Sequence, residues 1–416
     1  MNGRFGLLGL SLSHSHSPMI HAEFGDYEYA LYEKKPEEVE DFLLNGNFDG
    51  LNVTVPYKIT AKRCCAVLSD TARAAGSVNT IIKKADGTLC GDNTDCFGFG
   101  YLLDKAGVQT DCKTIILGNG GSCLAIQELI RIREAIRAAR PGKTKITVIS
   151  RGGENNYENI FHYSDAEVII NTTPLGMYPN NGVSPLPDLS VFGNCRAVID
   201  IIYNPLRTEL MLLAQQRGIL SAGGLPMLVA QAKKSSELFT KKTLPNEMID
   251  AVTAKIISSV QNIILIGMPG CGKSTAGAAL AKKTGREFID ADDEIIKAAK
   301  KPIEQIFYED GEEAFRRYET EALEKICKRS GLIVATGGGA VTREKNKHLL
   351  KQNGMIFFLD RDISELPTNG RPLSVEHGVA ALYEKRLPLY EEWCDVKIKA
   401  NDSDGAVKKI LAAFYK

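Results

Sequence analysis

The chain has 416 residues, of which 44% are hydrophobic and 25% are charged, with 51 basic and 51 acidic side chains. This length exceeds what one hydrophobic core usually serves, so two or three domains are expected. The even balance of charge argues against a nucleic acid or a membrane surface as a partner and favours small molecules. The ten cysteines lack zinc or disulfide spacing. Because no signal peptide or long apolar run is evident, we expect a cytoplasmic protein.

Short β-branched runs alternate with helical patterns along the chain. This rhythm predicts an α/β fold with mainly parallel sheets. A polar, proline-containing stretch at 239–246 is followed by a helix and a new strand, which predicts a domain boundary near residues 255–260. The expected strands are 5–8, 50–55, 114–117, 146–149, 168–170, 197–201, 263–266, 332–334 and 355–359.

The loop after the first strand, at 13–18, is rich in hydroxyl groups. Ligands lie at the carboxyl ends of strands in open α/β sheets, so Ser15 and Ser17 are candidates to bind a carboxylate or hydroxyl groups. Ser17 followed by Pro18 is also typical of a helix N-cap. From these residues alone, the cap is the favoured interpretation.

Polar side chains also follow the next strands. Thr54 and Lys58 come after a strand that a proline cuts short. A lysine at a strand end can act as an acid or base when it is partly desolvated, although most such lysines are solvated. Asn79, Asn93 and Asp95 also follow short strands, and by default they would close Asx turns.

A strand, a glycine turn and a helix follow one another at 114–140, which is typical of a dinucleotide site with pyrophosphate at the helix N-terminus. The motif is incomplete because Cys123 stands at the third glycine position. The next strand ends in Ser150 and Arg151, where a NAD enzyme usually carries an acid. The arginine suits a 2′-phosphate and favours NADP, while Glu154 nearby leaves NAD open.

A second glycine loop, 267–275, also lies between a strand and a helix pattern. It matches G-x-x-x-x-G-K-[ST], in which backbone N–H groups bind phosphate. Lys273 is expected to bridge the outer phosphates, and Ser274 to hold magnesium. The alternative is an ordinary glycine-rich turn.

Carboxylates, a basic helix and more glycines follow this loop. Asp290 and Asp292 are spaced to project on the same side of an extended chain, so one can face a metal and the other an acceptor. Glu312 and Arg316 have the spacing of a helical i,i+4 ion pair, which is the favoured interpretation from these residues alone. The triple glycine at 337–339 would let a ligand approach the backbone closely.

Six stretches, 13–18, 52–58, 91–95, 170–177, 200–205 and 224–231, together resemble the shikimate dehydrogenase family over roughly residues 3–240. The resemblance implies a substrate domain at 1–97 and 223–255 and a Rossmann-like NADP-binding domain at 98–222. It implies that Lys58 and Asp95 form the catalytic pair. The implied shikimate contacts are Ser15, Ser17, Thr54, Asn79, Tyr203 and Gln231. The implied NADP contacts are Gly118, Gly120, Gly121, Ser150, Arg151, Ile201 and Gly224. The family's usual Asn-Arg-Thr is replaced by Ser-Arg-Gly at 150–152.

The stretches 267–275, 288–295, 335–341, 371–373 and 385–390 resemble the shikimate kinase family over roughly residues 261–415. The resemblance implies a P-loop α/β/α domain at 260–416. It implies that Asp292, Arg316, Gly338 and Arg386 bind shikimate, with Asp292 also receiving the hydroxyl proton. Lys273 and Arg371 would neutralise the transferred phosphoryl group, and Ser274 and Asp290 would hold Mg²⁺. The implied ATP contacts are Gly270, Cys271, Gly272, Lys273, Ser274 and Thr275. The arginine that usually stacks on adenine before Arg371 is missing, and the lid is short.

The expected function is bifunctional. The first half would reduce 3-dehydroshikimate with NADPH, and the second half would phosphorylate shikimate with ATP. In the alternatives, the first half is a catalytically inactive shikimate sensor, or a dehydrogenase that uses quinate and NAD. The sequence leaves a monomer and a homodimer open, and we expect no channelling between the sites.

Overall fold

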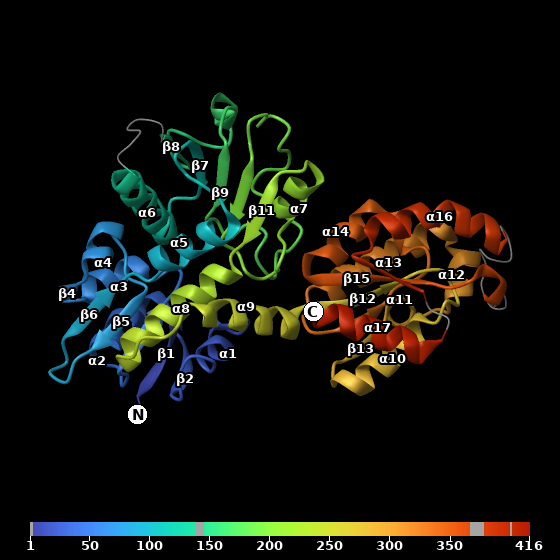
Figure 1. Cartoon of the computed structure of the whole chain (residues 1–416), viewed down its shortest axis with the longest axis horizontal. Coiled ribbons are helices and arrows are strands. Elements are labelled where there is room, and N and C mark those ends of the chain that lie inside the picture. The colour runs from blue at the N-terminus through green and yellow to red at the C-terminus, as the bar shows by residue number, and fades with distance from the viewer. Residues whose placement is uncertain (1–2, 138–144, 367–377, 400–401) are drawn as a thin grey trace. The chain divides into compact units, whose positions relative to one another are not determined.

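The computed structural model describes residues 3–137, 145–366, 378–399 and 402–416. The chain forms two compact units (Figure 1). The first contains Met1–Met177, Val183–Asn204 and Leu213–Ile256, and the second contains Tyr178–Gly182, Pro205–Leu212 and Ile257–Lys416. Two sheets lie in the first unit and one in the second, and most strand pairs are parallel, which confirms the predicted α/β fold.

The first sheet of unit 1 has the strand order β2-β1-β3-β5-β6-β4. Strand β1 is parallel to both of its neighbours, whereas β5 is antiparallel to β3 and β6. Leu8, Leu51 and Ile81 of this sheet form one core with Val39 and Leu43 of α2. The strands are β1 (Arg4–Gly9), β2 (Glu28–Glu33), β3 (Gly50–Val53), β4 (Val67–Leu68), β5 (Thr80–Lys83) and β6 (Leu89–Asp92). The helices are α1 (Ser17–His21), α2 (Pro36–Asn45), α3 (Lys58–Cys64), α4 (Asp70–Ala75) and α5 (Asp95–Ala106).

The second sheet of unit 1 is fully parallel, with the order β11-β10-β9-β7-β8. Its core joins Ile116 of β7 and Ile170 of β9 to Phe99 of α5 and Ile126 of α6. The strands are β7 (Lys113–Leu117), β8 (Lys145–Ile149), β9 (Val168–Asn171), β10 (Ala197–Asp200) and β11 (Leu220–Gly223). The helices are α6 (Gly121–Arg137), η1 (Ile160–Tyr163), α7 (Glu209–Gln216), α8 (Leu225–Thr240) and α9 (Glu247–Val260), of which α7 and α9 belong partly to unit 2.

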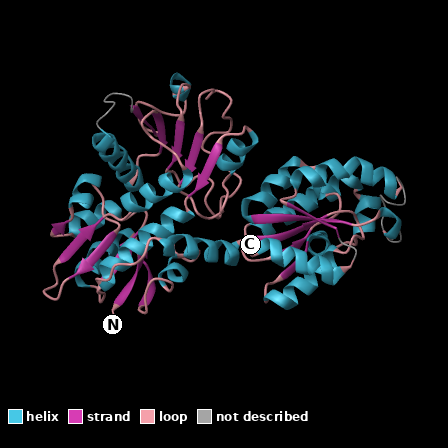
Figure 2. Ribbon diagram, in the orientation of Figure 1, coloured by secondary structure: helices cyan, strands magenta, loops and turns pink. Residues whose placement is uncertain are grey.

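Unit 2 has a parallel sheet with the order β13-β14-β12-β15-β16 and helices on both faces (Figure 2). All five residues of the central strand β12 are buried, which explains its continuous apolar run because both faces are covered. The strands are β12 (Asn262–Ile266), β13 (Phe288–Asp290), β14 (Ile333–Ala335), β15 (Gly354–Asp360) and β16 (Val396–Lys399). The helices are α10 (Lys273–Thr284), α11 (Ala291–Ala299), α12 (Ile303–Glu309), α13 (Gly311–Cys327), η2 (Ala340–Thr342), α14 (Glu344–Asn353), η3 (Ile363–Glu365), α16 (Val379–Trp393) and α17 (Ser403–Phe414).

Each sheet reverses its strand order at the strand that comes first in the chain. These strands are β1, β7 and β12, and each has later strands on both sides. The carboxyl end of such a strand is where α/β proteins open a crevice for ligands. The three loops that the sequence analysis singled out, 13–18, 118–121 and 267–275, follow these strands directly.

Every expected strand is present, with ends that differ by at most two residues. Strands β2, β11 and β16 lie at sheet edges, and the sequence did not predict them. Many of their residues are partly exposed, so their sequences lack the clear alternation of apolar and polar side chains that predicts a strand. The N-cap interpretation of Ser17 is wrong. Ser17 is buried inside α1, whose N-cap is His16, and no side chain caps the helix.

Candidate active sites

A buried lysine and a buried aspartate meet in unit 1. Lys58 is the first residue of α3 and Asp95 is the first residue of α5. Lys58 Nζ lies 2.6 Å from Asp95 Oδ2, and the two side chains are only 11% and 7% exposed. Asp95 Oδ1 accepts a second hydrogen bond, of 2.7 Å, from Asn79 Nδ2. The carboxylate is therefore fixed at both oxygens, and it holds the ammonium in place.

The asparagines around this pair have different roles. Asn93 Oδ1 accepts from the Asp95 N–H at 3.1 Å, which is an Asx turn, as predicted. The Asx-turn prediction for Asn79 is wrong, because its Oδ1 accepts from the Thr94 N–H, 15 residues further on, at 2.8 Å. Asn79 therefore connects the region where β3 ends and β5 begins to the start of α5. These bonds form within a buried polar network that also fixes Asp95.

Helix α8 brings Gln231 to the same network. At Gly98, α5 approaches α8 so closely that a Cβ would lie 2.6 Å from the Met227 carbonyl oxygen. Gln231 Oε1 accepts from Thr94 Oγ1 at 3.4 Å. A glycine on α5 therefore lets two helices that are far apart in sequence share the polar site at Asp95.

The predicted hydroxyl residues lie near the end of β1. The Thr54 N–H donates to the Leu8 carbonyl at 2.9 Å, and the Ser17 N–H donates to Ser15 Oγ at 3.2 Å. Burial raises the pKa of Tyr203, and a hydrogen bond with Ser15 opposes that shift. The structure thus brings together Ser15, Ser17 and Tyr203 as one group, and Lys58, Asp95, Asn79 and Gln231 as another.

The glycine turn of the second sheet lies beside the lysine. Gly118 has a φ of +99°, and α6 begins at Gly121. A Cβ on Gly121 would lie 3.2 Å from Lys58 Cβ, so the turn touches the lysine stem. The remaining predicted cofactor residues follow parallel strands of this sheet, and the carboxyl ends of parallel strands meet at one edge. They are Ser150 and Arg151 after β8, Ile201 after β10 and Gly224 after β11.

The backbone conformation of the phosphate loop in unit 2 depends on its glycines. Gly270 and Gly272 have φ values of +83° and +97°, which other residues rarely adopt. Lys273 begins α10 and is buried, and its Nζ donates to the Gly267 and Met268 carbonyls at 2.9 and 3.0 Å. The loop therefore places an ammonium at a helix N-terminus, where an anion is favoured.

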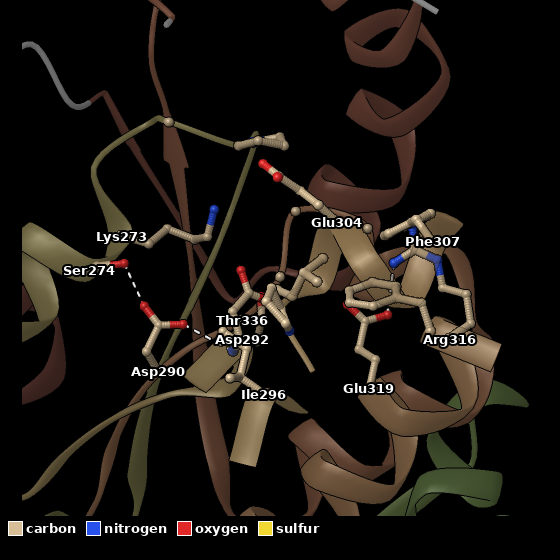
Figure 3. Close-up of a pocket in the computed structure, with 18 of the residues that line it drawn as sticks. Lys273, Ser274, Asp290, Asp292, Ile296, Glu304, Phe307, Arg316, Glu319 and Thr336 are labelled. Carbon is tan, nitrogen blue, oxygen red and sulfur yellow. Dashed lines mark hydrogen bonds and ion pairs between the residues drawn. The ribbon is translucent and has the colours of Figure 1, made fainter. Parts of the chain in front are cut away.

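Ser274 and Asp290 form the part of this loop that suits a cation. Ser274 Oγ lies 2.5 Å from Asp290 Oδ2, as the dashed line in Figure 3 shows. A hydroxyl beside a carboxylate is the donor set of Mg²⁺ in phosphate loops. Within the described ranges no cluster of three His, Cys, Asp or Glu could hold a metal. A cation here would therefore need phosphate or water oxygens to complete its coordination, which Mg²⁺ accepts readily.

These groups open into a cavity of about 660 Å³. Arg316 and Arg386 line it together with Asp292. Burial raises the pKa of Asp292, the neighbouring Asp290 raises it further, and Lys273 opposes the shift. Arg386 Nη1 donates to the Gly338 carbonyl at 3.2 Å. Phosphate-binding groups, a carboxylate and two guanidinium groups thus share one cavity. Arg371 lies outside the described residues, as do the stretch before it and the first part of the expected lid, whose remainder belongs to α16.

The predicted pair of Glu312 and Arg316 exists, with a shortest distance of 3.1 Å, but it is not the main contact of Arg316. Arg316 Nη1 also lies 2.9 Å from Glu319 Oε2, and Glu319 is completely buried whereas Glu312 is 52% exposed. Burial raises the pKa of Glu319, and Arg316 opposes the shift. Sequence reasoning missed Glu319. Its i,i+3 spacing from Arg316 was the available signal. Other cavity residues that it missed include Ile296, Glu304, Phe307 and Thr336, which Figure 3 labels.

A nucleotide turn at a switch point beside a buried lysine–aspartate pair defines an α/β dehydrogenase, and a phosphate loop that opens on an arginine-lined cavity defines a P-loop kinase. Residues 7–81 match the family model of the shikimate dehydrogenase substrate binding domain, and residues 269–415 match the shikimate kinase model. A shikimate dehydrogenase (NADP(+)) of Clostridium perfringens strain SM101 is 34% identical over 250 residues, which cover 56% of this chain and 91% of the relative. The chain belongs to the shikimate dehydrogenase family and carries a shikimate kinase domain at its C-terminal end.

Solved structures agree with this assignment. A shikimate dehydrogenase from Peptoclostridium difficile is 32% identical, with a TM-score of 0.56, and the match covers 62% of this chain and 98% of that one. A shikimate 5-dehydrogenase from Thermus thermophilus, solved with NADP(H) and shikimate, is 26% identical, with a TM-score of 0.53, over 61% of this chain and 99% of that one. Across the described part of the chain, no helix is both long and apolar enough to cross a membrane.

Proposed function

We propose that the chain catalyses two consecutive reactions. Unit 1 reduces 3-dehydroshikimate to shikimate with NADPH, and unit 2 phosphorylates shikimate to shikimate 3-phosphate with ATP. The observation that carries the proposal is that each unit places its reactive groups beside its own nucleotide loop. Lys58 touches the turn at Gly121 in unit 1, and Asp292 lines the same cavity as Lys273 in unit 2.

In unit 1, NADPH supplies the hydride. The ketone oxygen then becomes an alkoxide, which needs a proton donor within hydrogen-bond reach. The ammonium of Lys58 is that donor, and Asp95 holds it through the 2.6 Å contact. We assign the shikimate ring to Ser15, Ser17, Thr54, Asn79, Tyr203 and Gln231, and NADP to Gly118, Gly120, Gly121, Ser150, Arg151, Ile201 and Gly224.

In unit 2, phosphoryl transfer needs mostly positioning and neutralisation of charge. Asp292, which lines the cavity, would receive the proton of the attacking hydroxyl, and the guanidinium groups of Arg316 and Arg386 would bind the substrate carboxylate. Lys273 neutralises the phosphoryl group as it moves, and we assign the same role to Arg371. Ser274 and Asp290 would hold Mg²⁺, which screens the phosphate charges. Gly338 would contact the ring, and Gly270, Cys271, Gly272 and Thr275 the nucleotide phosphates.

We assign the substrate domain to 1–97 and 223–255, the NADP-binding domain to 98–222 and the kinase domain to 260–416. The described chain holds all ten cysteines as free thiols, which supports a cytoplasmic location because thiols stay reduced there. The alternative of an inactive sensor is not favoured, because the Lys58–Asp95 pair is intact.

The test is a two-step assay on the purified full chain. NADPH oxidation is measured with 3-dehydroshikimate and without ATP, and ADP formation is measured with shikimate and without NADPH. Lys58→Ala should strongly slow only the first reaction, and Lys273→Ala only the second, so in each variant the unaffected reaction shows that the other unit is intact. Failure of the unaltered chain to oxidise NADPH would refute the first assignment. Higher activity with quinate and NAD would replace it with the quinate alternative.

A further inference from the structure

The start of helix α6 reaches the ammonium of Lys58. Lys58 Nζ donates a hydrogen bond of 3.0 Å to Ser122 Oγ. Ser122 is the second residue of α6, and it belongs to the glycine turn that follows β7. Its hydroxyl is not at the capping position, which precedes the first helical residue. The hydrogen bond with Lys58 is therefore not explained by capping of α6.

The backbone around Ser122 is held against the lysine at two further points. A Cβ on Gly121 would lie 3.2 Å from Lys58 Cβ and 3.4 Å from Lys58 Cδ. Ser77 Oγ donates to the Gly121 carbonyl at 3.2 Å, and Asn93 Nδ2 donates to Ser77 Oγ at 3.0 Å. Because no side chain separates the turn from the lysine stem, these contacts hold the backbone of Ser122 close to Lys58, where its Oγ can reach the ammonium.

The number of acceptors decides where the ammonium points. A lysine ammonium has three N–H donors. Asp95 Oδ2 accepts one at 2.6 Å and Ser122 Oγ accepts another at 3.0 Å. Two fixed acceptors define the rotation about the Cε–Nζ bond and leave one N–H for a substrate oxygen. With Asp95 alone, the end of the lysine side chain could swing about its single hydrogen bond to the carboxylate and change the direction of the other two N–H groups.

We propose that Ser122 is a positioning residue that aims the Lys58 ammonium at the substrate oxygen. The proposal rests on the proposed dehydrogenase function and adds a residue to it. Ser122 acts through Lys58. Its loss therefore slows proton transfer while shikimate, which Ser122 does not hold, still binds.

The experiment compares Ser122→Ala with Ser122→Thr in the full chain. Saturating NADP and varied shikimate give kcat and KM, and NADPH fluorescence gives the dissociation constant of the cofactor. Ser122→Ala should lower kcat about 10-fold, as expected for one hydrogen bond to a charged group, and change KM less than about 2-fold. Ser122→Thr keeps the hydroxyl and should restore kcat to within about 3-fold of the unaltered chain.

Ser77→Ala is the matched comparison, because Ser77 bonds the same turn without touching Lys58 Nζ. It loosens the turn but keeps the Ser122 acceptor, so it should lower kcat less than Ser122→Ala does. NADPH binding by each variant reports that unit 1 is folded, and phosphorylation by the kinase unit reports the same for unit 2. An unchanged kcat in Ser122→Ala would overturn the proposal. Weaker NADPH binding with an unchanged kcat would also overturn it, by assigning Ser122 to the cofactor. No NADP-linked activity in the unaltered chain would instead refute the proposed function.

Discussion

Two buried carboxylate oxygens in the kinase cavity lack hydrogen-bond partners among the described residues. They are Asp292 Oδ1 and Glu319 Oε1. Both lie close to Gly337, because a Cβ there would lie 3.0 Å from the first and 2.6 Å from the second. Burial raises the pKa of Glu319, and the negative charge of Asp292 also raises it. We predict that Asp292→Asn stabilises unit 2 while it disables phosphorylation.

The magnitude follows from the missing donor. A buried acceptor without a partner costs about 1–3 kcal/mol. Asp292→Asn replaces one carboxylate oxygen with an N–H donor near Gly337 and removes one negative charge from beside Glu319. We expect a gain of about 1–2 kcal/mol. That gain corresponds to a rise of roughly 2–8 °C in melting temperature for a unit of this size. Loss of the proton acceptor should lower kcat of the kinase about 10²–10⁴-fold.

The assay uses the single tryptophan of the chain. Trp393 is completely buried in unit 2, so its fluorescence follows the unfolding of that unit alone. Asp293→Asn is the matched control. Asp293 is exposed and shares the first turn of α11 with Asp292, so both variants lose the same interaction with the helix dipole. A melting temperature for Asp292→Asn that does not exceed that of Asp293→Asn would refute the reasoning.

The stability gained by Asp292→Asn should increase as pH rises. Burial raises the pKa of Asp292 above its ordinary 3.8, so the folded chain keeps the proton at a pH where the unfolded chain has lost it. The unaltered chain therefore loses stability as pH rises through this window, whereas an asparagine does not titrate. The advantage of Asp292→Asn should be full above the raised pKa and absent below 3.8. An advantage that does not change with pH would contradict this origin.

Three further predictions concern the sites directly. Lys58→Ala should lower kcat of shikimate oxidation about 10²–10⁴-fold with a smaller effect on KM, and an intact kcat would remove Lys58 from the mechanism. Arg151→Ala should weaken NADPH binding about 10- to 100-fold and leave NADH binding unchanged, as measured by cofactor fluorescence, and equal effects on both would exclude a contact with the 2′-phosphate. Gly339→Ala would place a Cβ 2.2 Å from Arg316 Nη2. It should therefore raise the KM of the kinase for shikimate about 10-fold, which steady-state kinetics would contradict if KM were unchanged.

Local patterns predicted the parts of the sites that depend on backbone conformation. The phosphate loop was predicted because its glycines, lysine and serine are contiguous and lie between a strand and a helix. The predicted pairing of Lys58 with Asp95 came from family resemblance, since nothing in the two separate motifs requires contact. The structure supplies the reason for that contact, because β3, β5 and α5 bring the two residues together through Asn79.

Residues whose role depends on burial could not be predicted in this way. Glu319 follows Arg316 by three residues on a helix, and the same spacing on a solvated face would mean only a weak ion pair. Glu319 matters in the cavity because it is completely buried, and this burial results from the packing of the whole domain. From the sequence, Ser122 is likewise only part of a glycine turn. Its contact with Lys58 could not be predicted, because the two residues are 64 positions apart in the chain. The wrong N-cap at Ser17 has a similar cause, because the helix begins one residue earlier than the Ser-Pro pair suggests.

The presence of both compact units in one polypeptide fixes the ratio of their active sites at one to one. A cell that makes the two activities as separate proteins can correct a slow step by making more of one protein. This chain cannot, so the relative capacity of the two steps is set by their turnover numbers alone. Selection on either site therefore acts on the balance between reduction and phosphorylation as well as on the rate of one reaction.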